Sequence, residues 1–272
     1  MRMAVLRLSG LVVCLFLLPS SAFATWSVVA VDRNSGRVVI ASATCLALEE
    51  PQSLRQVQAV IVPGVGIAAC QALIDGSGRN QKLVYDELRK GTDPKEIIRL
   101  LKGDGGIEQR QYGIVDLNGH AVGYTGAGTL GVSLDRQGQV PGTGIYYSIQ
   151  GNILRDERVI SEAVKAFVNT NGALTDRVMA ALETGDHLGG DRRCDCTTTP
   201  TAKAPCEGKS SHVAYILMAE KGDASDSYNT GQYALYLSVT QGNVRPDENA
   251  NPVKTLRLRY DAWRKKQPQS YR

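Results

Sequence analysis

The chain has 272 residues, of which 43% are hydrophobic, and its 31 Lys and Arg residues against 27 Asp and Glu residues give a formal net charge of +4. This length allows one large domain or two small ones with a substantial buried core. The near balance of charge gives no electrostatic reason to expect nucleic acid or an anionic membrane as a partner.

Residues 1–24 have the pattern of a secretory signal peptide. Basic residues precede the apolar run 8–18, and the small, uncharged tail 19–24 ends in Ala22-Phe23-Ala24. This order is typical of a cleaved leader, and the apolar run is shorter than the roughly 20 residues that span a bilayer. We therefore expect a secreted or periplasmic protein that begins at Thr25 and has no membrane association after leader cleavage. An uncleaved anchor is the alternative.

The remaining elements are expected in blocks of strands separated by pairs of helices. Strands are predicted over 26–32, 37–44, 58–62 and 66–71, helices over 81–90 and 94–102, strands around the Asn118-Gly119 hairpin and over 144–154, helices over 156–168 and 174–184, strands over 212–220 and 233–239, and a closing helix over 251–265. These follow from apolar periodicity, capping residues and turn signals. The block order favours an α+β fold with mainly antiparallel sheets under helical layers.

Five cysteines lie beyond the leader. They are Cys45, Cys70, Cys194, Cys196 and Cys206. An exported chain meets oxidising conditions, so disulfides are expected, the odd number predicts one free thiol, and the pairing is left open.

Three of these cysteines lie in the polar segment 189–211, which we expect to be a surface loop closed by a disulfide. The alternative is zinc bound by Cys194, Cys196, Cys206 and His212, which have the right ligand types. We expect the disulfide, and neither a metal nor another cofactor.

Thr25 is a candidate nucleophile. It heads the apolar run TWSVVAVD. A threonine hydroxyl needs a base beside it, and a free α-amino group, with a usual pKa of about 7.7 to 8.0, can be that base. The alternative is that the leader peptidase prefers a small or hydroxylated residue after its cut.

Several sequence blocks support the first interpretation. They are TWSVVAVD from Thr25, GVGIAACQA over 64–72, EQRQYGIVDLNGHAVGYTG over 108–126, QGNIL over 150–154 and GGDRR over 189–193. Together and in this order, they resemble the DUF1028 family, which is grouped with the N-terminal-nucleophile (Ntn) hydrolases. Segment 72–76 departs from the family's usual tryptophan and Asn-Pro pair, so the substrate pocket is expected to differ.

The resemblance implies a four-layer αββα sandwich over residues 25–272, as a single domain with the cysteine loop inserted at 189–211. It also implies an amide hydrolase with Thr25 as nucleophile, acting on a small-molecule or peptide amide. The alternative is a binding module that keeps the scaffold without turnover. Homo-oligomer formation is left open.

The resemblance suggests supporting residues near Thr25. Asn152 is a candidate oxyanion donor, or it bonds its own turn. Asp191 with Arg192 is expected to orient the amine or bind a substrate carboxylate, or to form a surface ion pair.

Further candidates come from the strands. Gln71 and Gln111 are candidate cleft amides, or strand-end residues. Ser42 and Thr44 alternate on one strand and are expected to face the site, or to belong to core or surface.

Overall fold

The computed structural model describes residues 25–201 and 203–267. The predicted signal peptide, residues 1–24, lies outside the described residues, so its cleavage stays a prediction. Among the helices of the described part, none is long and apolar enough to cross a membrane.

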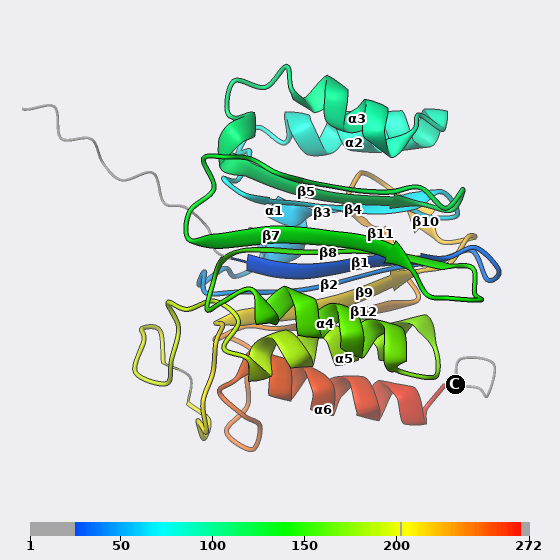
Figure 1. The fold of residues 1–272 in the computed structure, drawn as a ribbon. Helices are drawn as coiled ribbons and strands as arrows, with labels where there is room; N and C mark the ends of the chain where they lie inside the picture. The colour runs from blue at the N-terminus through cyan, green and yellow to red at the C-terminus, as the bar shows by residue number, and fades with distance from the viewer. Residues whose placement is uncertain (1–24, 202, 268–272) are drawn as a thin grey trace, which may run out of the picture.

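Two antiparallel sheets lie face to face at the centre of the molecule (Figure 1). Across the described residues, the larger has six strands in the order β12-β9-β2-β1-β8-β7, and the smaller has four in the order β3-β4-β5-β6. The larger sheet consists of β1 (Thr25–Asp32), β2 (Arg37–Thr44), β7 (Val132–Gln139), β8 (Ile145–Leu154), β9 (Val213–Ala219) and β12 (Leu235–Val239). The smaller consists of β3 (Ala59–Val62), β4 (Gly66–Ala72), β5 (Arg110–Asp116) and β6 (Ala121–Thr125), and a short separate pair is formed by β10 (Ala224–Ser225) and β11 (Gly231–Gln232).

Helices cover the outer faces of both sheets (Figure 1). The smaller sheet is covered by α2 (Arg79–Lys90) and α3 (Pro94–Leu101), and the larger by α4 (Arg158–Asn169), α5 (Leu174–His187) and α6 (Pro252–Lys265). The short helix α1 (Leu54–Gln58) leads into β3, and a 3-10 turn, Ile107–Gln109, leads into β5. The predicted α+β sandwich with mainly antiparallel sheets is therefore confirmed.

Strand β1 is central because it pairs with β2 on one side and β8 on the other. Its side chains alternate between two cores: Trp26 and Val28 pack toward the α4–α6 layer, whereas Val29 lies between the sheets. Alternation along a strand places Thr25 and Ser27 on the same side as Val29. The first residue of the strand therefore directs its side chain between the two sheets.

Trp26 anchors the start of β1 to α5. Its indole is fully buried, and Nε1 donates a hydrogen bond to the carbonyl of Leu182 at 3.2 Å. At Gly190, φ is +34° and an added Cβ would lie 2.6 Å from the indole ring. Only glycine fits there, which explains the second glycine of the GGDRR block.

Most predicted elements are confirmed within a few residues. One difference is at 58–62, where the strand begins at Ala59 because Leu54–Gln58 forms α1. Another is β7, which has no counterpart among the predicted elements. Its sequence, VSLDRQGQ, is polar and only half-buried because it lies at the edge of the larger sheet.

The cysteines form two disulfides among the described residues, Cys45–Cys194 and Cys196–Cys206, and Cys70 is the one free cysteine there. The prediction of disulfides with one free thiol is confirmed, and the second bond closes the polar loop as expected. In this pairing the three sulfur atoms of the loop are all in disulfides, and a disulfide sulfur offers no thiolate to zinc.

The two disulfides are expected to contribute unequally to stability. Replacing Cys45 and Cys194 by alanine should lower the free energy of unfolding by about 2 to 5 kcal/mol, measured by urea denaturation. The matched control, with Cys196 and Cys206 replaced, should lose roughly 2 kcal/mol less, because loop-closure entropy grows with the logarithm of the sequence separation, 149 against 10 residues. Equal losses would contradict this.

Candidate functional site

The candidate site lies where β1 begins, between the ends of its neighbouring strands. Thr25 is the register partner of Thr44 on β2 and of Asn152 on β8. Its Oγ1 donates a hydrogen bond to Thr44 Oγ1 at 3.2 Å, and the residue is 2% exposed. The backbone ladder therefore brings Thr25, Thr44 and Asn152 together.

Gln71 joins this strand end to the smaller sheet. Its Nε2 donates to the carbonyl oxygen of Thr25 at 3.1 Å and to Gln111 Oε1 at 2.8 Å. Its Oε1 accepts from Ser27 Oγ at 2.6 Å and from Gln58 Nε2 at 2.9 Å. One amide thus bonds the Thr25 carbonyl through Nε2 and Ser27, two residues further along β1, through Oε1.

The network continues from Gln58 in the layer between the sheets. Gln58 Nε2 also donates to Ser42 Oγ at 3.0 Å, and its Oε1 accepts from the hydroxyl of Tyr215 at 2.9 Å. Gln150 Nε2 donates to Ser27 Oγ at 2.6 Å. Buried polar groups are tolerated when they are hydrogen-bonded, and this network satisfies them mutually.

The predicted cleft amides Gln71 and Gln111 are both buried and bonded to protein groups. Ser42 lies in the same network, between the sheets. The sequence analysis did not single out Gln58 or Gln150. The available signal was a polar residue between apolar neighbours, as at Gln150 in YYSIQGNIL, because such a residue in a buried strand needs a buried partner.

Asp191 lies at the same end of the sheet. It forms an isolated β-bridge with Leu154, and its Oδ2 accepts the backbone N–H of Cys45 at 3.1 Å. Its carboxylate pairs with Arg193, whose Nε donates to Oδ1 at 3.0 Å and whose second guanidinium nitrogen donates to Oδ2 at 2.8 Å. Asp191 is fully buried, whereas Arg193 is exposed, so the ion pair lies where the core meets the surface.

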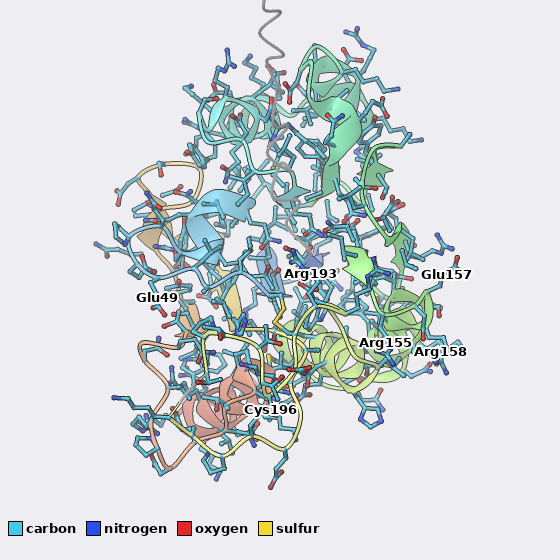
Figure 2. All side chains as sticks on the ribbon, turned by 90° about the vertical axis from the view of Figure 1, so that its left-hand side faces the viewer. Glu49, Arg155, Glu157, Arg158, Arg193 and Cys196 are labelled. Atoms are coloured by element: carbon cyan, nitrogen blue, oxygen red, sulfur yellow. A yellow bond between two sulfur atoms is a disulfide. The ribbon has the colours of Figure 1, made fainter. Side chains whose placement is uncertain are left out.

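The arginine beside Asp191 is therefore Arg193, not its neighbour Arg192. Arg192 is exposed. Figure 2 looks onto the end of the sandwich where β1 begins, and Arg193 lies near the middle of that face. Sequence adjacency alone did not decide which of the two arginines turns back to Asp191.

Backbone strain flanks Thr25. Ala72 (φ 69°) and Ile153 (φ 51°) are the non-glycine residues with positive φ in the described part of the chain. One follows Gln71 and the other follows Asn152, so both adjoin partners of Thr25. A left-handed conformation is unfavourable for a β-branched residue, and strained backbone concentrates at functional sites.

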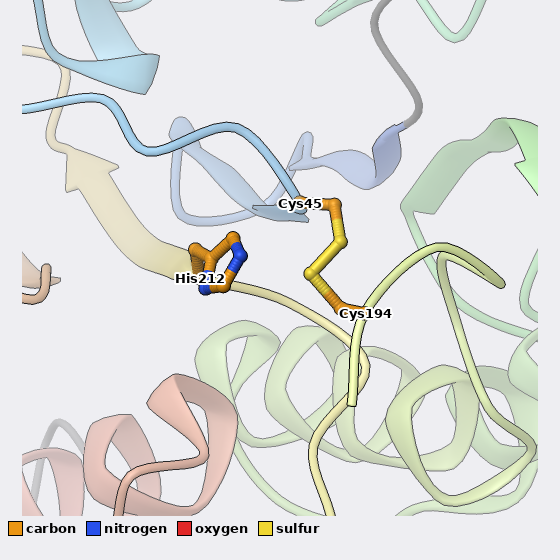
Figure 3. Close-up of side chains that lie close together, drawn as sticks. All are labelled: Cys45, Cys194 and His212. Carbon is orange, nitrogen blue, oxygen red and sulfur yellow. A yellow bond between two sulfur atoms is a disulfide. The ribbon is translucent and has the colours of Figure 1, made fainter. Parts of the chain in front are cut away.

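A disulfide and a histidine lie beside this strand end. The sulfurs of Cys45 and Cys194 and a ring nitrogen of His212 lie within 4.8 Å of one another (Figure 3). Burial and the nearby Lys209 ammonium lower the pKa of His212 to about 4, so its imidazole is neutral at pH 7. Because both sulfurs are bonded to each other, this group has one ligand atom for a metal, the imidazole nitrogen.

Together, the fold and this strand end define an α+β sandwich protein with a threonine at the head of its central strand. The chain belongs to the family of unknown function DUF1028, whose family model matches residues 25–199. No curated protein matches it.

A solved structure has the same fold. The crystal structure of protein SPO2555 from Silicibacter pomeroyi, a DUF1028 protein, is 21% identical in sequence, with a TM-score of 0.63 over 88% of each chain. At this level of identity, the likeness concerns the fold.

Burial of neutral His212 makes stability depend on pH. The unfolded histidine has a pKa near 6.5 and the folded one a pKa of about 4, so between these values the unfolded chain binds more protons. The free energy of unfolding should therefore fall, by up to about 3 kcal/mol, as the pH is lowered from 7 to 4. Urea denaturation at both pH values measures this.

The matched control is His212→Gln, which removes the titrating ring. The variant should lose less stability over the same pH range than the wild type. The same loss in both proteins would show that His212 is not the group responsible.

Proposed function

We propose that the protein is an exported amide hydrolase in which Thr25, freed by cleavage after Ala24, is the N-terminal nucleophile. The observation that carries the proposal is the position of Thr25. It heads a strand that is paired on both sides, and its hydroxyl lies between the sheets beside Thr44. The family match, which starts at residue 25, and the strained Ala72 and Ile153 support it.

The chemistry uses the two functional groups of one residue. The α-amine takes the proton of Oγ1 as Oγ1 attacks the amide carbonyl carbon. The protonated amine then gives this proton to the leaving nitrogen as the C–N bond breaks, which leaves an ester on Thr25. A water molecule, deprotonated by the same amine, hydrolyses the ester and releases the carboxylic acid. No metal or other cofactor is needed for this sequence of steps.

The surrounding residues divide into two roles. Gln71 and Gln111 are positioning residues, since Gln71 bonds the Thr25 carbonyl and Gln111 accepts a hydrogen bond from Gln71. Asn152, the register partner of Thr25, is the candidate donor to the oxyanion. Asp191, held by Arg193, is the candidate acidic group that orients the amine.

Arg192 has a different place in this proposal. Its exposed side chain is free of the Asp191 pair and remains a candidate for a substrate carboxylate. The substrate itself is an amide of a small molecule or a peptide, and the reaction takes place outside the cytoplasm, where disulfides form.

A non-catalytic binding module is the second candidate. It is favoured by the 2% exposure of Thr25 and by the hydrogen bond that already engages its hydroxyl. In that case the polar network would serve only to hold the two sheets together.

The first residue of the exported protein and the state of its amine distinguish the amide hydrolase from the binding module. Intact mass and N-terminal sequencing of the protein recovered after export should give a chain that begins at Thr25 with a free amine. On an amide library, Thr25→Ala should lower kcat/KM by at least a thousandfold, and Thr25→Ser should retain part of the activity, because only the hydroxyl and the amine react.

Two controls sharpen this test. Thr92→Ala, in the turn between α2 and α3, should leave activity unchanged. A chain with one glycine inserted before Thr25 should fold and be inactive, because the amine no longer belongs to the threonine. Activity in the inserted form, or in Thr25→Ala, would rule out the N-terminal nucleophile and leave the binding module.

A further inference from the structure

A small cavity adjoins Thr25 between the two sheets. Its lining comes from β1, α1, the end of β4 and the segments that follow β2 and β4. The lining residues are Thr25, Leu46, Leu54, Val57, Gln58, Cys70, Gln71, Ala72 and Ile74. The cavity offers about 10 Å³ to the centre of a water-sized group, which is room for one methyl group or one water molecule.

The lining is apolar and uncharged. Aliphatic side chains provide most of it, and the polar atoms of Gln58 and Gln71 already have partners in the network. Cys70 packs in the core beneath α2 and α3, and burial raises the pKa of its thiol, so the thiol adds no charge here. A charged or strongly polar occupant would lose its hydration here without gaining a partner.

The residues that line the cavity differ in burial, and the cavity is partly open. Leu54 and Ala72 are buried, whereas Leu46, Val57 and Ile74 are only partly buried and form a rim. A group that enters past this rim has Thr25 as part of its wall.

We propose that this cavity is the acyl subsite of the Thr25 reaction and that it takes a short, uncharged aliphatic acyl group such as acetyl or propionyl. The inference rests on the proposed function, since it names the substrate class of that same site. The methyl end of the acyl group fills the cavity, the carbonyl carbon lies at Thr25 Oγ1, and the leaving amine points to solvent. Longer chains clash with the rim, and charged chains are excluded by the lining.

The first test is hydrolysis of a series of p-nitroanilides by the protein recovered after export. Acetyl and propionyl p-nitroanilide should give kcat/KM values at least tenfold above those for hexanoyl and succinyl p-nitroanilide. Release of p-nitroaniline is read by absorbance. A preference for the hexanoyl or the succinyl substrate would overturn the subsite.

The second test enlarges the rim. In Ile74→Ala, the ratio of hexanoyl to acetyl kcat/KM should rise by roughly tenfold, since each methylene that gains an apolar site contributes about fourfold. Leu46→Ala should shift the ratio in the same direction. Leu48→Ala is the matched control, because Leu48 is also partly buried in the same segment but does not line the cavity, and it should leave the ratio unchanged. An unchanged ratio in both rim variants would overturn the subsite.

Binding to a Thr25→Val variant tests the acyl subsite independently of the reaction at the Thr25 hydroxyl. Valine keeps the volume of threonine but has no hydroxyl. Saturation-transfer NMR should show binding of acetyl p-nitroanilide in preference to the succinyl compound, and Ile74→Ala in the same background should admit the hexanoyl compound. If this binding is seen but the wild type cleaves none of the anilides, the subsite stands and the proposed reaction fails. If acetyl p-nitroanilide neither binds nor is cleaved, the subsite fails.

Discussion

The hydrogen bond from Gln71 to the carbonyl oxygen of Thr25 joins the first residue of the central strand to the facing sheet. The same amide also bonds Ser27, Gln58 and Gln111. Inside a layer of low dielectric constant, moving one member of such a network leaves several polar groups without partners, and each loss is costly. The start of β1 is therefore held by a cooperative set of bonds, and its geometry depends on all of them.

Residues far apart in the chain meet at this strand end because the antiparallel register brings them there. Thr44 ends β2, Asn152 lies near the end of β8, and each pairs with Thr25 across the ladder. Asp191 follows α5 and is joined to the same end by its bond to the Cys45 N–H and by the adjacent Cys45–Cys194 disulfide. The larger sheet supplies the candidate reactive groups, and the smaller one supplies the positioning amides and much of the cavity wall.

The strands and helices that follow from local residue patterns could be predicted from the sequence. The features that depend on contacts between different segments of the chain could not. The strand from Thr25 and the strand 37–44 could be predicted from apolar runs bounded by turn signals, and a threonine directly after the predicted leader indicated the candidate nucleophile. The edge strand β7 could not be predicted in this way. Its polar residues form their hydrogen bonds with neighbours that cannot be identified from a short stretch of sequence. The choice of Arg193 over Arg192 depends on how the chain turns after the Leu154–Asp191 bridge, and the pairing of Cys45 depends on a contact across 149 residues.

Burial of Cys70 has a consequence for how the chain acquires its disulfides. Cys45 and Cys70 precede Cys194 in the chain, yet Cys45 pairs with the last of the three. The strands of the smaller sheet end at Thr125, so this sheet is complete in sequence before Cys194 emerges. Within it, the Cys70 thiol stays protonated, and a thiol without thiolate character does not attack a disulfide. Once this sheet has formed, the buried Cys70 thiol therefore does not compete with Cys194 for Cys45.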